Sequence, residues 1–331
     1  MLKRTRKFVL CPIVSLLLIM VAGSANAQPE HAVAPEVIED LIERLSNWGR
    51  WGDDDEAGTL NFITPEVRVA AASLVHSGRV VSLAQETLTE PSVDNANPYR
   101  HEMTATAEGG FPWALDDIGV NFHGYSHSHL DALCHLVHDG RMYNGFSAEE
   151  ISEDGCARLD IRSAGDGIVS RGVLLDMPLH FGERWLEPGT AIYREDIEAW
   201  EEEAGVRLQR GDVVLLRTGR WARRAAEGPW NVGQTAAGLH VSAVELLHER
   251  EVAVVGSDVA MDVTPSGIEG YPLPVHLLLL HAMGTLIFDN LELEALAEAA
   301  AAENRWEFLF TAAPMKVPGG TGSPLNPIAT F

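Results

Sequence analysis

The chain has 331 residues, a net charge of −24 and a hydrophobic fraction of 46%. The acidic charge argues against nucleic acid or an anionic membrane as a partner, because both would repel it. The apolar content suffices for a packed core, so we expect a soluble globular protein.

The first 27 residues show the three-part pattern of a secretory signal peptide. Basic residues precede an apolar run that is short for a membrane span, and a small-residue cleavage site ends at Ala27. An uncleaved anchor is the alternative. We expect cleavage after Ala27 and a periplasmic or secreted protein without membrane association. A single domain is expected over residues 28–331, because no repeat or long linker interrupts it.

Helical and strand-like patterns alternate along the rest of the chain. Helices are expected at 35–48 and 64–78, the second with Thr64 as N-cap and Gly78 as its stop. Strand-like runs follow at 79–83, 171–178, 211–219, 252–258, 285–289 and 307–313. Further helical patterns lie at 194–205, 241–251, 274–284 and 291–303. This alternation predicts an α/β fold.

The segment NFHGYSHSHLDALCHLVHDG, residues 121–140, gathers five of the 13 histidines. Four of them, together with Tyr125 and Asp131, occupy odd positions, which share one face of an extended strand. An unbroken strand over 123–135 would spread them across ~40 Å, so the chain must bend if they converge. We expect a strand that ends near His129, then a helical turn that begins near Asp131 and carries His135 on the same face.

Imidazole and carboxylate groups in this arrangement suit a divalent metal such as zinc or manganese. A solvated loop that merely buffers metal is the alternative. Such tracts are usually of low complexity, whereas this one carries apolar residues for burial: Leu130, Leu133, Leu136 and Val137.

Rival catalytic motifs are weak. The sequence contains no G-x-S-x-G, no G-x-x-x-x-G-K-[ST] and no H-E-x-x-H. Cys134 fits a buried filler residue better than a nucleophile. Whether it pairs with Cys156 in an oxidising compartment is left open by the sequence.

The stretch HSHLDALCH resembles the H-x-G-T-H-x-D-x-P-x-H signature of the cyclase-type metal-dependent hydrolases, which include bacterial kynurenine formamidase and isatin hydrolase. Further segments, at 47–64, 252–262, 274–297 and 319–329, resemble the longer branch of that family. The resemblance implies a mixed sheet of the swivelling β/β/α type with flanking helices. It also implies one or two divalent cations, zinc or manganese, and hydrolysis of an amide, lactam, lactone or ester of a small substrate.

Carried over by position, the metal ligands are His129, Asp131, His135, His276 and Asp289, the last where formamidases have Glu. The first signature histidine falls on Tyr125, the threonine on Ser128 and the proline on Leu133. The loss of that histidine implies one cation instead of two, unless His123 or His127 substitutes for it.

The expected catalytic residues are His135 or His276 for proton transfer, and Tyr125 as a donor to the developing oxyanion. Packing into the space of the absent histidine is the alternative for Tyr125. Trp48, Trp51 and Trp113 are candidates for an aromatic substrate pocket, with core packing as the alternative.

Two other functions are compatible with these residues. A metal-dependent lyase or dehydratase would use the cation to stabilise an enolate, and a non-catalytic periplasmic protein would bind metal or a small molecule at a degenerate site. The family resemblance further implies a homo-oligomer, a dimer or tetramer, with strands exchanged near the active site.

Overall fold

The computed structural model describes residues 31–110 and 112–331, so the expected signal peptide lies outside the described residues. Residues Val33–Phe331 form one compact unit. Within the described ranges, no helix is long and apolar enough to cross a membrane.

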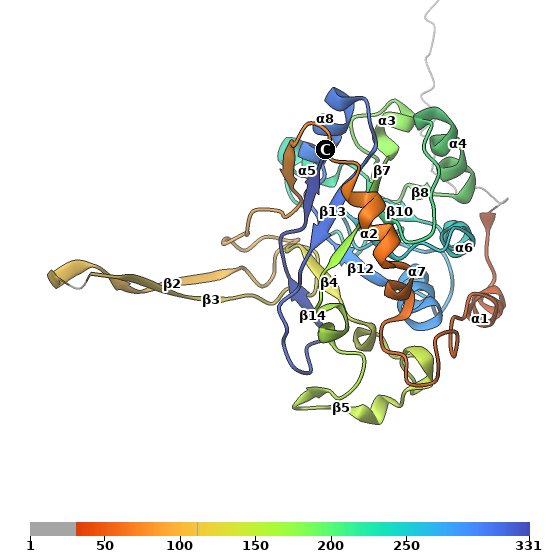
Figure 1. Ribbon diagram of the computed structural model, residues 1–331, viewed down its shortest axis with the longest axis horizontal. Helices are drawn as coiled ribbons and strands as arrows, with labels where there is room; N and C mark the ends of the chain where they lie inside the picture. Colours follow the sequence, from red (N-terminus) through yellow and green to blue (C-terminus); the bar gives the residue numbers. More distant parts are fainter. Residues whose placement is uncertain (1–30, 111) are drawn as a thin grey trace, which may run out of the picture. The chain divides into compact units, whose positions relative to one another are not determined.

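A nine-stranded mixed sheet organises this unit, with the strand order β1-β15-β13-β7-β9-β11-β12-β4-β14 (Figure 1). Its strands are β1 (Val80–Ser82), β4 (His129–Asp131), β7 (Ile168–Asp176), β9 (Val213–Arg217), β11 (Val254–Ser257), β12 (Leu286–Asp289), β13 (Glu307–Ala312), β14 (Gly322–Pro324) and β15 (Ile328–Thr330). β7, β9, β11 and β12 run parallel, and the outer pairs are antiparallel. The predicted α/β fold is confirmed, and all six predicted strands lie in this sheet.

The helices connect and cover the strands. They are α1 (Pro35–Arg44), α2 (Pro65–Ala72), α3 (Met177–Phe181), α4 (Arg194–Ala204), α5 (Arg220–Glu227), α6 (Val241–Glu249), α7 (Pro274–His276) and α8 (Glu294–Glu303). α2 packs against β7 and β13, α8 against β1 and β7, and α4 against α6. The core strands β9, β11 and β12 are buried almost throughout, as expected for parallel strands covered on both faces.

Several predicted helices differ in detail, and the first, expected over 35–48, ends at Arg44. Thr64 caps α2 as expected, but the helix ends at Ala72, and Gly78 lies in a left-handed turn that leads into β1. The helix expected over 274–284 is α7 followed by the π-helix η8 (Leu277–Met283), which ends at the left-handed Gly284. All seven η8 residues are buried, so the sequence has no polar face from which the helix type could be recognised.

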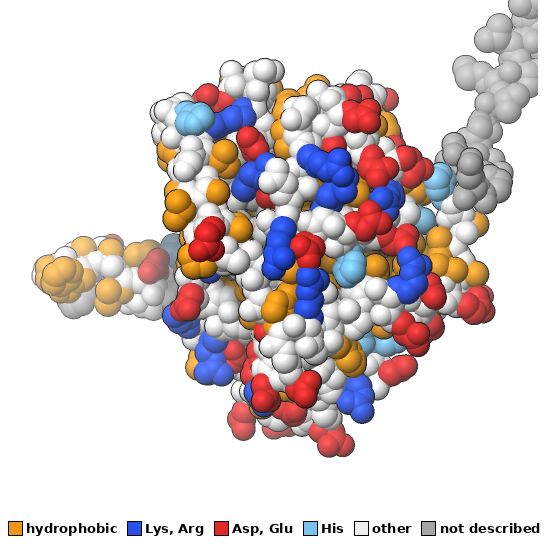
Figure 2. Space-filling view, turned by 45° about the vertical axis from the view of Figure 1, so that its right-hand side comes forward, with side chains coloured by type: hydrophobic (Ala, Val, Ile, Leu, Met, Phe, Trp, Pro, Cys, Tyr) orange, Lys and Arg blue, Asp and Glu red, His pale blue; other side chains and the backbone are white. Residues whose placement is uncertain are grey.

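A β-hairpin that the sequence did not predict is made by β2 (Arg100–Thr106) and β3 (Ala114–Gly119). It extends away from the sheet (Figure 1), and almost every residue of both strands is exposed. Figure 2 shows hydrophobic side chains along this projection, beside a body on which acidic and basic groups are interspersed. Two further two-stranded sheets are short. In one, β5 (Ile151–Ser152) pairs with β6 (Gly155–Cys156), and in the other, β8 (Ala191–Ile192) pairs with β10 (Gly238–Leu239).

Candidate metal centre

The pairing of β4 with β12 brings three predicted ligands onto one face of the sheet. His129 and Asp131 are two residues apart on β4 and therefore share a face. Asp289 stands opposite His129 in the antiparallel register, and opposed residues also share a face. All three side chains are buried, with 1% of His129, 2% of Asp131 and 5% of Asp289 exposed.

The predicted helical turn at Asp131 is wrong. Asp131 is the last residue of β4, which is held on both edges by β12 and β14. The chain stays extended through Ala132, and His135 follows in the short 3-10 helix η4 (Leu133–His135). The bend that brings His135 back to Asp131 is thus later than predicted, and it leaves His135 Nε2 at 4.0 Å from Asp131 Oδ2.

Two groups of potential ligands meet at Asp131. The first is His123, His129 and Asp131, and the second is Asp131, His276 and Asp289. Asp131 Oδ1 lies 3.0 Å from His123 Nδ1 and 3.4 Å from His129 Nε2. On the other side, His276 Nε2 lies 4.0 Å from Asp131 Oδ2 and 3.6 Å from Asp289 Oδ2.

Backbone and carboxylate acceptors orient the two buried imidazoles. His129 donates from Nδ1 to the carbonyl of His127 at 2.8 Å, and His276 donates from Nδ1 to Asp262 Oδ2 at 2.6 Å. Each ring therefore turns the lone pair of Nε2 toward the Asp131 group. This is the arrangement of metal-binding histidines, whose second nitrogen donates to a carbonyl or a carboxylate. Sequence reasoning missed the role of Asp262, although it lies in the family-like segment 252–262.

The electrostatics of the centre are dominated by burial and by the carboxylates. Burial disfavours the charged form of His129, but Asp131 and Asp289 outweigh it and raise the pKa of His129 to about 9. Burial likewise opposes the charge of His276, and Asp262 and Asp289 hold its pKa well above the usual value. Without a cation, the carboxylates therefore favour positive charge at this spot.

His123 and His135 complete the cluster. Their rings stack at a centroid distance of 4.0 Å, and His123 Nε2 contacts Thr321 Oγ1 at 2.9 Å. The side chain of His135 is 35% exposed, more than any other member. Burial lowers the pKa of His135, so its imidazole is neutral and able to accept a proton at neutral pH.

The donor set fits a divalent cation. Within the described residues, His123 Nδ1, Asp131 Oδ1 and Asp289 Oδ1 are buried and have no hydrogen-bond partner. His123 Nδ1 and Asp131 Oδ1 approach to 3.0 Å without hydrogen-bond geometry. Buried polar atoms are normally satisfied. A cation held by the first ligand group would contact His123 and Asp131, and one held by the second would contact Asp289.

His127, a candidate substitute ligand, and Tyr125, a candidate catalytic residue, belong to neither of these groups. His127 has its Nε2 at 3.4 Å from the carbonyl of Asn97, with its ring edge on Tyr99. Tyr125 packs against Gly233 and a small apolar cluster that includes Val232. It is His123 that approaches Asp131.

A cavity of about 120 Å³ opens beside His123 and Tyr125. Asn97, Asn121 and Asn231 are among the residues that line it. The three predicted pocket tryptophans do not line it. Trp48 donates to the carbonyl of His281, Trp51 packs edge-on against Phe62, and Trp113 is 64% exposed on the hairpin.

Cys134 and Cys156 form a disulfide, with their Cα atoms 6.5 Å apart. This resolves the pairing that the sequence left open. The bond ties η4, which carries His135, to β6.

Comparison with known proteins agrees with this geometry. The family model described as "Putative cyclase" matches residues 81–262. A crystal structure of a novel cyclase is 33% identical, with a TM-score of 0.78, and the match covers 88% of this chain and 99% of that one. Among curated proteins, no relative matches the chain.

Two isatin hydrolases share the fold. Isatin hydrolase A from Labrenzia aggregata, bound to benzyl benzoate, is 22% identical with a TM-score of 0.58, over 78% of this chain and 94% of that one. Isatin hydrolase A from Ralstonia solanacearum is 24% identical with a TM-score of 0.57, over 80% and 97%. By the family match and the 33% identical structure, this chain belongs to the cyclase family.

Proposed function

We propose that the protein is a metal-dependent hydrolase that cleaves an amide, lactam or lactone bond of a small substrate. The observation that carries this proposal is the pair of ligand groups that share Asp131, with buried donor atoms that lack partners on both sides of it. Two relatives of the same fold are isatin hydrolases, and isatin is a lactam.

The ligands proposed for the cation are His123, His129 and Asp131 on one side, and His276 and Asp289 on the other. We propose zinc or manganese, as one ion or as two that share Asp131. A bound divalent cation lowers the pKa of water from about 15.7 toward about 7 and polarises a carbonyl oxygen. Asp262 and the carbonyl of His127 keep His276 and His129 in the tautomers that present Nε2 to it.

His135 is the proposed proton carrier. It is neutral at neutral pH, adjoins Asp131 and is the most exposed member of the cluster, so it can accept a proton and release it to the leaving group. His276 is too well enclosed by Asp262 and Asp289 for that role. Burial raises the pKa of Tyr125, so its phenol stays protonated and can donate a hydrogen bond to a developing oxyanion.

The cavity beside His123 is the proposed substrate site. Its volume of about 120 Å³ is close to the ~150 Å³ that accommodates a benzene ring. A single-ring substrate whose polar edge faces the three asparagines fits this lining.

The test is elemental analysis of wild type, His129→Ala, Asp131→Ala and the control His76→Ala, whose histidine is exposed and contacts Arg305. Wild type and control should retain zinc or manganese, and the two ligand variants should lose it. Equal metal in all four proteins would contradict the proposal. A panel of lactams, lactones and amides then separates functions: water addition supports a hydrolase, elimination a lyase, and stoichiometric metal without turnover a binding protein.

We also propose that the mature protein is exported and begins at Gln28. The Cys134–Cys156 disulfide supports an oxidising compartment, where such bonds persist. Fractionation of the native host with N-terminal sequencing should recover a chain that starts at Gln28 in the periplasm or the medium. Recovery of the intact N-terminus in the cytoplasm would contradict export.

A further inference from the structure

Beside the metal centre lies a completely buried arginine, Arg220. Its side chain is 0% exposed, and it is the largest of the fully buried side chains in the described residues. A buried charge is costly unless it is paired and hydrogen-bonded. The partners of Arg220 therefore indicate its role in the structure.

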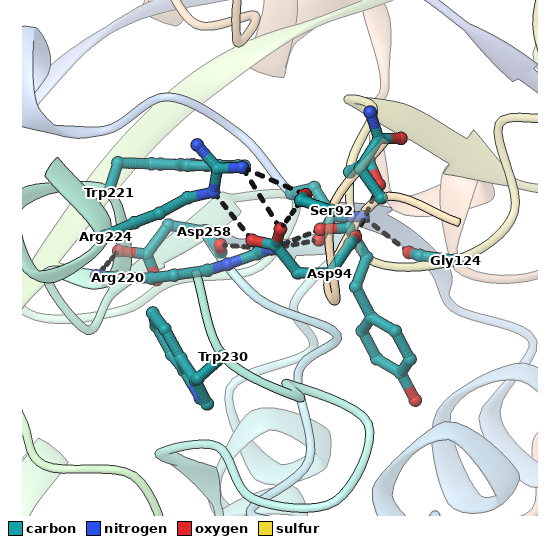
Figure 3. A network of polar contacts seen from close by, with 12 residues as sticks. Ser92, Asp94, Gly124, Arg220, Trp221, Arg224, Trp230 and Asp258 are labelled. Carbon is teal, nitrogen blue, oxygen red and sulfur yellow. Dashed lines mark hydrogen bonds and ion pairs between the residues drawn. The ribbon is translucent and has the colours of Figure 1, made fainter. Parts of the chain in front are cut away.

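The start of α5 fixes Arg220 in place. The carboxylate of Asp258 accepts backbone hydrogen bonds from Thr218, Gly219 and Arg220 at 2.8–3.1 Å. It thus satisfies the free N–H groups that begin a helix. The guanidinium lies over the ring of Trp221, 4.2 Å from its centroid. Figure 3 shows Arg220 extending from this anchor toward Asp94 and Gly124.

The guanidinium contacts three segments that surround the metal centre. Nη1 donates to Asn290 Oδ1 at 2.6 Å, and Nη2 donates to the backbone carbonyl of Tyr125. Nη2 also lies 3.6 Å from Asp94 Oδ2. Asn290 directly follows the candidate ligand Asp289, Tyr125 lies between His123 and His129, and Asp94 lines the cavity.

Asn290 transmits this contact to the histidine segment. It has a left-handed backbone with φ 57°. Its Nδ2 donates to the carbonyl of Gly124 at 2.7 Å, and its own carbonyl accepts from Ser128 Oγ at 2.7 Å. The residue after one ligand is thereby tied to Gly124, directly before Tyr125, and to Ser128, directly before His129.

Neutralising Asp94 does not by itself require Arg220. Arg224 already binds Asp94 through two hydrogen bonds, at 2.7 and 3.1 Å (Figure 3). What Arg220 adds is the bridge between Asn290 and Tyr125. A planar guanidinium can donate in several fixed directions at once, whereas the single ammonium of lysine cannot reproduce that fork.

We propose that Arg220 is a positioning residue for the metal centre, which through Asn290 and the carbonyl of Tyr125 holds Asp289 and the His123–His129 segment in register. This inference rests on the proposed function, because it takes those side chains as the ligand set. Arg220 itself touches neither the cation nor the substrate.

The experiment measures Mn²⁺ binding by titration calorimetry on the mature chain. The variants are Arg220→Lys, Asn290→Ala and the double variant, and the control is Arg171→Lys. Arg171 is likewise an arginine that joins two segments, here through the carboxylates of Asp212 and Glu307, but it lies on β7, which β9 and β11 separate from β12.

We expect both single variants to weaken Mn²⁺ binding about tenfold or more, the low end for residues that support metal ligands. The double variant should be little weaker than either single one, since both break one bridge. The control should lose thermal stability and keep wild-type Mn²⁺ affinity. If Arg220→Lys loses stability but binds Mn²⁺ like the wild type, its role is structural and the inference is wrong.

Hydrogen exchange on the metal-free proteins tests the same bridge without a cation. Arg220→Lys should exchange faster than wild type within 121–131 and 286–292, and at the wild-type rate in β7 and β13. Unchanged exchange in the first two segments, or a uniform rise throughout, overturns the inference. A wild type that binds no Mn²⁺ and no Zn²⁺ overturns the proposed function instead, and the exchange result then decides on the bridge alone.

Discussion

His276 donates a hydrogen bond from Nδ1 to Oδ2 of Asp262 at 2.6 Å, and both side chains are buried. Asp262 also accepts from the backbone N–H of Val275 through Oδ1 and from that of His276 through Oδ2. One carboxylate thus fixes the start of α7 and the tautomer of the imidazole. Its three donors favour the ionised form although burial raises the pKa of Asp262.

Asp262→Asn should weaken metal binding about 10-fold to 100-fold, the usual effect of removing a carboxylate behind a metal-binding histidine. Both carboxylate oxygens accept hydrogen bonds, so the amide must turn its NH₂ toward a donor and lose at least one bond. Competition with a chromogenic chelator measures the affinity. The control is Asp212→Asn, a buried carboxylate bound by Arg171. Equal metal affinity in both variants would contradict the assignment of His276 as a ligand.

His135→Gln should retain metal and lose turnover. If His135 carries the proton, kcat falls about 100-fold to 10,000-fold, the range for removal of a general acid–base group. The measurement pairs kcat on the best substrate of the panel with metal content by elemental analysis. Loss of metal together with kcat would instead make His135 a ligand, as the family signature implies. An unchanged kcat would remove it from the mechanism altogether.

Part of the candidate site could be predicted from the sequence. The odd-numbered pattern and the family signature selected His129, Asp131, His276 and Asp289, and these residues meet. The sequence could not predict which strands, distant along the chain, lie side by side. The antiparallel pairing of β4 with β12 sets Asp289 opposite His129, and no local pattern encodes that register.

Other features were missed for different reasons. α5 carries RWARRAAE, whose buried Arg220 and Trp221 give no apolar stripe by which a helix is recognised. The roles of Arg220 and Asn290 were also missed, although Asn290 lies in the family-like segment 274–297, because the contacts of Arg220 join residues 70 or more positions apart. The hairpin strands β2 and β3 were missed because neither face of the hairpin is buried, so apolar and polar residues do not alternate along them.

Protonation of His281 should link stability to pH. Burial, and then His138, lower the pKa of His281 to about 4, although Asp139, the backbone of Arg141 and Glu39 act in the opposite direction. The unfolded chain takes up this proton near its ordinary pKa of about 6.5. Between these values the unfolded state binds more protons, so the free energy of unfolding falls as pH decreases through this window. Above the window, the contribution of neutral His281 to stability is fully present.

His281→Phe keeps a ring against Trp48, whose indole bonds only to the backbone carbonyl of residue 281. Urea unfolding at about pH 7 and about pH 4.5, on either side of the ordinary histidine value, should show a smaller loss of stability in the variant than in wild type. An equal loss in both proteins would mean that His281 is not the titrating group.

Removing the disulfide should cost stability. Cys134 and Cys156 are 22 residues apart, and closing a loop of that length is worth about 3 kcal/mol in the unfolded-chain account. Cys134→Ala/Cys156→Ala should lower the free energy of unfolding by about that amount, measured with urea. As a check on the bond, the denatured and unreduced mature wild type should incorporate no iodoacetamide. Two alkylated thiols in that sample would show that the bond does not form.

We propose that the exposed hairpin is a contact for a second copy of the chain. Of the large hydrophobic side chains that are exposed in the described residues, four gather on β2, β3 and the residue before β3: Met103, Trp113, Leu115 and Ile118, each at least 50% exposed. A strand pair with no core of its own is stable only against a partner.

Leu115→Asp/Ile118→Asp should therefore shift the protein from dimer or tetramer toward monomer in sedimentation velocity. The control is Val69→Asp, since Val69 is 69% exposed on α2 and lies apart from the hairpin. A wild type that sediments as a monomer would refute the assembly, and an oligomer that survives the double substitution would place the contact elsewhere.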